Sequence, residues 1–168
     1  MSTIQEDMAE FRRQLESGSI QAAYRALITF MTGLRARYKN EWGEQAVSGL
    51  YQGYLDMTYF ALFPASLKPH GLKVAIVFNY NAFRFEAWLS ARNRQVQRHY
   101  WELFRDYPLT EYRLIAPASG IDSIVESTLA DDFDLGDPDG LTERIETRTA
   151  AFVADMEQLL SRLEEERP

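Results

Sequence analysis

The sequence predicts an α+β domain built on a mainly antiparallel sheet. Three observations support this prediction: apolar residues at helical spacing near both ends of the chain, aromatic and β-branched runs in the middle, and short turns between those runs. Strands joined by hairpins pair antiparallel, so the sheet is expected to be mainly antiparallel. The N- and C-terminal helices are expected to pack on it. With 168 residues and no long Gly, Ser or Pro linker, residues 1–168 are expected to form a single globular domain.

Two helices are expected to open the chain. Thr3 and Glu6 have the spacing of a capping box, and helically spaced apolar residues follow as far as Gly18. A second apolar stripe then runs from Ile20 to Tyr38. Because the link between the two helices is so short, we expect them to pack side by side.

Three strands are expected next, over 51–62, 72–78 and 82–89, because these runs are rich in aromatic and β-branched residues. The segment 79–81, Asn-Tyr-Asn, suits a tight hairpin, since Asn tolerates a positive φ. That hairpin makes the second and third strands neighbours in the sheet.

The second half of the chain is expected to hold a helix, two short strands and a long final helix. Ser90 or Asn93 can begin the first of these helices, and Asp137 followed by Pro138 suits the start of the last. The two strands are expected over 112–116 and 123–129. The predicted order is α-α-β-β-β-α-β-β-α, with about four to five strands in the sheet.

Composition excludes several classes of function. The chain has no Cys and only two His, so disulfides, thiolate nucleophiles, iron–sulfur clusters and multi-histidine metal sites are not expected. It has no Gly-rich nucleotide loop, no nucleophile elbow and no HExxH motif, so no cofactor is expected. It also has no apolar run of 18 residues and no signal-peptide pattern, which predicts a cytoplasmic protein that does not span a membrane.

Charge is distributed unevenly along the chain. Residues 1–113 hold 14 Lys or Arg and 11 Asp or Glu, whereas residues 114–168 hold 4 and 14. The overall charge of −7 argues against general affinity for nucleic acid, which needs clustered cations. The acidic segment 114–168 has two interpretations. It can form a solvated C-terminal helix, or it can form a surface that repels nucleic acid or docks a basic partner.

The clearest candidate site is one face of the third predicted strand. Alternation places Arg84, Glu86 and Trp88 on this face. If the first strand is a neighbour, Tyr54, Asp56 and Thr58 share it. The opposite, apolar face is expected to consist of Phe83, Phe85, Ala87 and Leu89.

This set of side chains can act in several ways. Arg84 can grip a carboxylate or phosphate, and the rings of Trp88 and Tyr54 can flank a planar ligand. Asp56 and Glu86 can serve as acid and base or bind a hard cation, but Trp88 stands where Asp…Glu-x-Lys nucleases need Lys. The same residues can instead form a cross-strand ion-pair cluster with a structural role.

Cationic and aromatic residues also gather on the helix that follows. Arg94, Arg98 and Trp101 fall close to one helix face and can contact phosphate or single-stranded nucleic acid. The simpler interpretation is a solvated helix face, with pairs such as Arg98 and Glu102 four residues apart.

Several short blocks spread over nearly the whole chain resemble one known family. They are 18–24, 53–60, 73–78, 84–89, 95–101 and 120–124, among them Gly-Tyr-Leu-Asp-Met-Thr-Tyr-Phe and Arg-Phe-Glu-Ala-Trp-Leu. Together they are similar to a bacterial domain-of-unknown-function family, the one numbered seven thousand. The resemblance implies a small stand-alone bacterial domain and brings no activity, cofactor or catalytic residue.

The leading hypothesis is a non-enzymatic ligand-binding or protein-interaction domain, with an unknown small molecule or protein as its partner. The alternative is a metal-dependent hydrolase or nuclease-like enzyme that uses Asp56 and Glu86. A third hypothesis is a homodimer formed through an uncovered strand or the C-terminal helix. The residues expected to bind the ligand are Tyr54, Asp56, Arg84, Glu86, Trp88, Arg94, Arg98 and Trp101.

Overall fold

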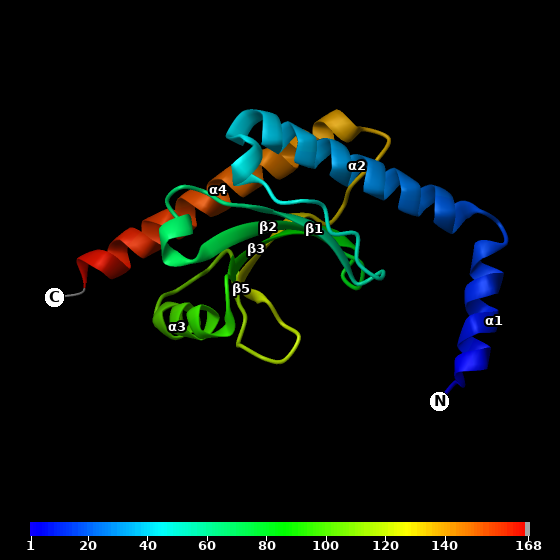
Figure 1. Cartoon of the computed structure of the whole chain (residues 1–168), viewed down its shortest axis with the longest axis horizontal. Helices are drawn as coiled ribbons and strands as arrows, with labels where there is room; N and C mark the ends of the chain where they lie inside the picture. Colours follow the sequence, from blue (N-terminus) through cyan, green and yellow to red (C-terminus); the bar gives the residue numbers. More distant parts are fainter. Residues whose placement is uncertain (167–168) are drawn as a thin grey trace.

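The computed structural model describes residues 1–166, in which four α-helices flank a five-stranded sheet (Figure 1). The strands lie in the order β1-β2-β3-β5-β4, and each is antiparallel to its neighbours. The predicted α+β class is confirmed. The helices and strands are α1 (Ile4–Leu15), α2 (Ser19–Trp42), β1 (Met57–Leu62), β2 (Leu72–Asn79), β3 (Arg84–Ala91), α3 (Arg94–Phe104), β4 (Arg113–Leu114), β5 (Ser123–Ala130) and α4 (Pro138–Glu165).

One face of the sheet, the core face, lies beneath α2 and α4 (Figure 1). Phe78 and Phe85 are cross-strand partners on this face, and their ring centroids are 4.9 Å apart. Phe30 of α2 packs on Phe85 at 5.4 Å, and Tyr38 of the same helix packs on Phe60 at 5.9 Å. Because each buried side chain of this size contributes about 1.5–3 kcal/mol, the core face supplies most of the hydrophobic stabilisation.

The opposite face, called the second face here, is covered only in part. α3 lies against one end of it, on the other side of the sheet from α2 and α4 (Figure 1). The side chain of Asn93 caps α3 by accepting a hydrogen bond from the Val96 amide at 2.9 Å, and Tyr100 and Phe104 of α3 are buried. The register places on the second face the side chains of Met57, Tyr59, Lys73, Ala75, Val77, Asn79, Arg84, Glu86, Trp88, Glu126 and Thr128.

The first strand is shorter than predicted. β1 begins at Met57 rather than at position 51, because the preceding segment makes a turn with positive φ at Gly53 (76°) and Leu55 (63°). Within residues 51–56, Tyr51 forms an isolated bridge to the sheet, through two backbone hydrogen bonds with Tyr59.

The third strand begins two residues later than predicted. Phe83 has a φ of 54° and belongs to the turn between β2 and β3, so it is exposed and not part of the core face. Asn93, not Ser90, caps the following helix. The predicted strand over 112–116 is reduced to β4, whereas the one over 123–129 is confirmed as β5.

α1 stands apart from the rest of the molecule. Its capping box forms as predicted, with the Thr3 hydroxyl accepting from the Glu6 amide and the Glu6 carboxylate accepting from the Thr3 amide. None of its residues is buried, and it turns away from α2 at Gly18, whose φ is 77° (Figure 1). The expectation that the first two helices pack side by side is therefore wrong. Within residues 1–166, no helix has the length and apolar character needed to cross a bilayer.

Candidate functional site

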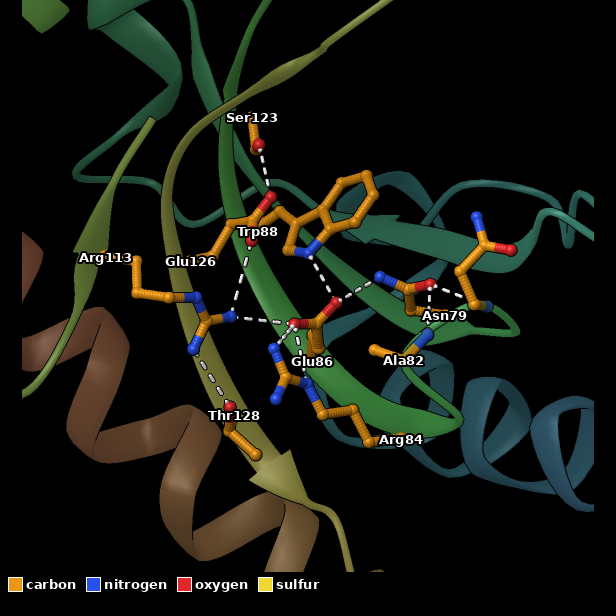
Figure 2. Close-up of polar contacts among 10 residues, drawn as sticks. Asn79, Ala82, Arg84, Glu86, Trp88, Arg113, Ser123, Glu126 and Thr128 are labelled. Carbon is orange, nitrogen blue, oxygen red and sulfur yellow. Dashed lines mark hydrogen bonds and ion pairs between the residues drawn. The ribbon is translucent and has the colours of Figure 1, made fainter. Parts of the chain in front are cut away.

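A buried carboxylate occupies the middle of the second face (Figure 2). The side chain of Glu86 is 0% exposed. Its Oε2 accepts hydrogen bonds from Nη2 of Arg113 at 2.7 Å and from Nε of Arg84 at 3.1 Å. Its Oε1 accepts from Nδ2 of Asn79 at 2.9 Å and from Nε1 of Trp88 at 3.4 Å. Each carboxylate oxygen is therefore engaged by two donors.

Arg113 joins this carboxylate to strand β5 (Figure 2). Its Nη2 lies 3.3 Å from Oε2 of Glu126, and its Nη1 donates to the hydroxyl of Thr128 at 3.1 Å. Ser123 donates to the other oxygen of Glu126 at 2.7 Å. These contacts define the Glu86 network, which consists of Asn79, Arg84, Glu86, Trp88, Arg113, Ser123, Glu126 and Thr128.

The Glu86 network fixes the geometry of the second face. Removing a carboxylate from water costs several kcal/mol unless cations and hydrogen bonds replace the lost hydration, and here Arg84 and Arg113 do so. The hydrogen bond from Trp88 orients its indole. Asn79, while donating to Glu86, accepts at Oδ1 from the amides of Asn81 at 3.1 Å and Ala82 at 3.2 Å, which ties the β2–β3 turn to the network.

A cavity of about 340 Å³ opens beside the network, between the second face and the start of α3. Its floor comes from three adjacent strands and includes the rings of Tyr59 and Trp88 with the small side chain of Ala75 between them in the sheet. Lys73 and Ser90 line the same cavity. They are cross-strand partners, two residues along each strand from the pair formed by Ala75 and Trp88. The cavity thus has an aromatic part and a polar part.

The polar part holds groups without partners. Ser90 is only 3% exposed, yet its hydroxyl makes no hydrogen bond within residues 1–166. In the same described range, neither Lys73 nor Arg92 forms an ion pair, although both line the cavity. Arg94 and Asp122, which also line it, lie 3.5 Å from each other. Two cations therefore remain uncompensated.

The backbone of Arg92 is bonded to the turn at Gly71, and its exposed side chain lies against that glycine. Its backbone amide donates to the carbonyl of Gly71 at 2.8 Å. Gly71 has a φ of 70°, and a Cβ there would lie 3.1 Å from Cδ and Nε of Arg92. Glycine at position 71 thus allows the turn and lets the arginine side chain lie against it.

The family model for a domain of unknown function, DUF7000, matches residues 4–160, nearly the whole chain. The chain belongs to this family. No curated protein and no solved structure matches it. The part of this DUF7000 domain that the structure describes also holds no group of three or more His, Asp or Glu side chains placed to bind a metal ion.

The structure brings three of the sequence-predicted residues of the DUF7000 domain together. Arg84, Glu86 and Trp88 share the second face, as their alternation predicts. Tyr54 and Asp56 do not join them, because they precede β1 and the register places Met57 opposite Asn79. The expectation of a shared face is wrong for these two.

Tyr54 and Asp56 form their own turn instead. Tyr54 is 89% exposed, and its backbone amide donates to Oδ1 of Asp56 at 2.8 Å. Backbone hydrogen bonds from Tyr54 and Met57 lower the pKa of Asp56 below its usual value. The expectation is wrong for Thr58 as well: it is paired with Phe78, is buried on the core face and donates to the carbonyl of Gln52 at 2.6 Å.

The three predicted residues of α3 separate into two groups. Arg94 lines the cavity and holds the loop that precedes β5, since its Nη1 donates to the carbonyl of Ile121 and to Oε1 of Gln97, the latter at 2.9 Å. Arg98 and Trp101 do not line the cavity, and the Arg105 guanidinium lies 5.7 Å from the Trp101 ring.

The sequence prediction did not include several residues of the site. Arg113, the closest partner of Glu86, comes from β4, whose pairing with β5 leaves no local pattern in the sequence. Lys73 and Ser90 follow the same two-residue alternation as Trp88. Extending the third strand to position 91 would have identified Ser90 as a residue of the second face.

Proposed function

We propose that this DUF7000 domain is a non-enzymatic binding protein whose small-molecule ligand occupies the cavity between the second face and α3. The observation that carries the proposal is the lining of this cavity, where the rings of Tyr59 and Trp88 lie beside polar side chains, among them Ser90, that have no hydrogen-bond partner in the described residues. Small-molecule sites typically combine apolar and aromatic walls with a few polar groups that orient the ligand, and this cavity has both. A volume of about 340 Å³ suits a small molecule.

The Glu86 network supports binding rather than catalysis in this proposal. A general base or a metal ligand needs a free carboxylate oxygen, but four donors occupy the oxygens of Glu86. Asp56 is engaged in its own turn outside the network. No observation therefore favours the alternative of a metal-dependent hydrolase that uses Asp56 and Glu86. We further propose that the protein is bacterial, as the family resemblance of its sequence implies, and that it is cytoplasmic.

Titration of the ¹⁵N-labelled full chain with indole, phenylacetamide and phenylacetate tests the proposal. We expect at least one of these planar probes to cause saturable shifts of the amides of Ala75, Trp88 and Ser90. An Ala75→Phe variant fills the floor of the cavity and should abolish those shifts. Ala36→Phe makes the same chemical change on α2, in a separate groove of about 930 Å³ between α2 and the start of α4, and should leave them unchanged.

Two results would overturn the proposal. One is that none of the three probes shifts the cavity amides. The other is that Ala75→Phe, shown to be folded by its melting temperature, binds the probes as the unmodified chain does. Shifts that instead depend on Ala36 would assign the ligand to the α2–α4 groove.

A further inference from the structure

We infer that the ligand of this cavity carries an anionic oxygen group, a carboxylate or a phosphate, on a planar ring. The inference rests on the proposed function and names the class of molecule that the cavity takes. It follows from how charge and aromatic surface are divided within the cavity.

The charged groups that line the cavity have an excess of cations. The lining holds the cations Lys73, Arg92 and Arg94 and the anion Asp122. Arg94 and Asp122 lie 3.5 Å apart and offset each other. Lys73 and Arg92 have no ion-pair partner within residues 1–166, so the cavity retains the charge of two cations. An anion in the cavity would supply the missing counter-charge.

The free polar groups gather at one end of the cavity. Lys73 and Ser90 are direct cross-strand partners, so their Cβ atoms are about 4.5–5.5 Å apart. Arg92 follows Ser90 by two residues, and its exposed side chain lies against the turn at Gly71. An ammonium, a hydroxyl and a guanidinium on adjacent positions offer several donors to one group of acceptor oxygens. Charge-assisted hydrogen bonds of this kind are about twice as strong as neutral ones.

The aromatic part of the cavity lies next to Lys73 and Ser90 along the strands. Ala75 and Trp88 are the next cross-strand pair, and Tyr59 belongs to the adjacent strand β1. Trp88 is oriented by its hydrogen bond to the buried Glu86. Since Ala75 is small, a planar group can lie on this floor against the two rings while its anionic substituent reaches Lys73 and Ser90.

A matched pair of probes tests the charge requirement. Phenylacetate and phenylacetamide have nearly the same shape but differ in charge, and phenyl phosphate distinguishes a phosphate from a carboxylate. We expect isothermal titration calorimetry to show that at least one anion binds about tenfold or more tightly than the amide, as a charge-assisted contact implies. The anion that binds more tightly identifies the preferred group.

Two substitutions locate the anion. Lys73→Met keeps an unbranched side chain one atom shorter and removes the charge, so it should weaken anion binding about tenfold while leaving phenylacetamide unchanged. Ser90→Ala should weaken anion binding about threefold. The control is Lys39→Met, which makes the same change on α2, where Lys39 pairs with Glu44 on the other side of the sheet. It should leave the binding of all three probes unchanged.

The possible failures are distinguishable. If phenylacetamide binds in the cavity as tightly as both anions, or if Lys73→Met does not weaken anion binding, the anionic class is wrong but the binding function stands. If no probe binds in the cavity, the proposed function is wrong and this inference falls with it. Weakening by Lys39→Met equal to that by Lys73→Met would show a general charge effect and would also overturn the inference.

Discussion

The two faces of the sheet are buried by different physical means. Along β3, the neighbours Phe85 and Glu86 are both 0% exposed. Phe85 is covered by apolar side chains of α2 and by other aromatic rings, whereas Glu86 is covered by two guanidinium groups, an amide and an indole. A residue that is buried in this protein therefore does not necessarily belong to its hydrophobic core.

The difference matters because the two kinds of burial contribute differently to stability. Apolar burial stabilises the fold directly. A buried ion-pair network roughly offsets its own desolvation cost, so it contributes little net stability but holds its side chains in one arrangement. The core face therefore stabilises the domain, and the second face positions Trp88 and the cavity beside it.

The largest effect is expected on the core face. Phe78→Ala removes a ring that contacts Tyr80, Phe83, Phe85 and Phe133 and should lower the free energy of unfolding by about 3–5 kcal/mol. Urea denaturation followed by tryptophan fluorescence measures this loss. A loss below about 1 kcal/mol would show that the core face is not the main source of stability.

The next largest effect is expected on the second face, when the counter-ions of Glu86 are removed. The double variant Arg84→Ala/Arg113→Ala leaves a buried carboxylate without a cation and should lose about 3 kcal/mol. Each single variant should lose much less, because the other guanidinium remains, and the double loss should exceed the sum of the two. Arg12→Ala on α1 is the control and should change stability by less than about 0.5 kcal/mol. Additive losses would contradict the network.

The smallest effect concerns a polar atom within the core. Burial raises the pKa of Tyr38 to about 12, with the nearby Thr149 opposing the shift in part. The neutral phenol is favoured in the folded state, so its contribution is complete below the unfolded pKa of about 10 and is lost as pH rises from 10 to 12. Unfolding free energies measured between pH 9 and 11.5 should fall by roughly 1–2 kcal/mol through this group.

Tyr38→Phe identifies the source of that alkaline loss. The buried Tyr38 hydroxyl lies near Thr149 but makes no hydrogen bond of normal geometry in residues 1–166, so removing it should cost little stability at pH 7. The variant should lose less stability at high pH than the unmodified chain does. Part of the dependence will remain, because the pKa values of Tyr80 and Tyr112 are also raised, mainly by burial. An unchanged pH profile would assign the effect to those residues instead.

Periodicity predicted the architecture and the centre of the site. Alternation in β3 places Arg84, Glu86 and Trp88 on one face, and this pattern is local, so a single sequence reveals it. The same reasoning was wrong for Asp56, because the turn before β1 contains Leu55 with a positive φ, which its residue type does not suggest. Side-chain alternation does not continue through such a turn.

The rest of the site depends on contacts between distant parts of the chain. Arg113 reaches Glu86 from a strand 27 positions away, and only the pairing of β3, β5 and β4 brings the two together. The cavity depends on where α3 begins, which the sequence left open between Ser90 and Asn93. If α3 began after Ser90, this residue would cap the helix. Because Asn93 caps α3 three residues later, Ser90 lines the cavity wall instead.

The isolated position of α1 makes it the least stable part of the fold. None of its 12 residues is buried, and a free helix of that length is marginal in water. Local contacts sustain it, including hydrogen bonds from Arg13 and Gln14 that lower the pKa of Glu10 to about 2. Warming should therefore unwind this helix before the sheet melts, so that far-ultraviolet circular dichroism begins to change at temperatures where tryptophan fluorescence still reports an intact domain.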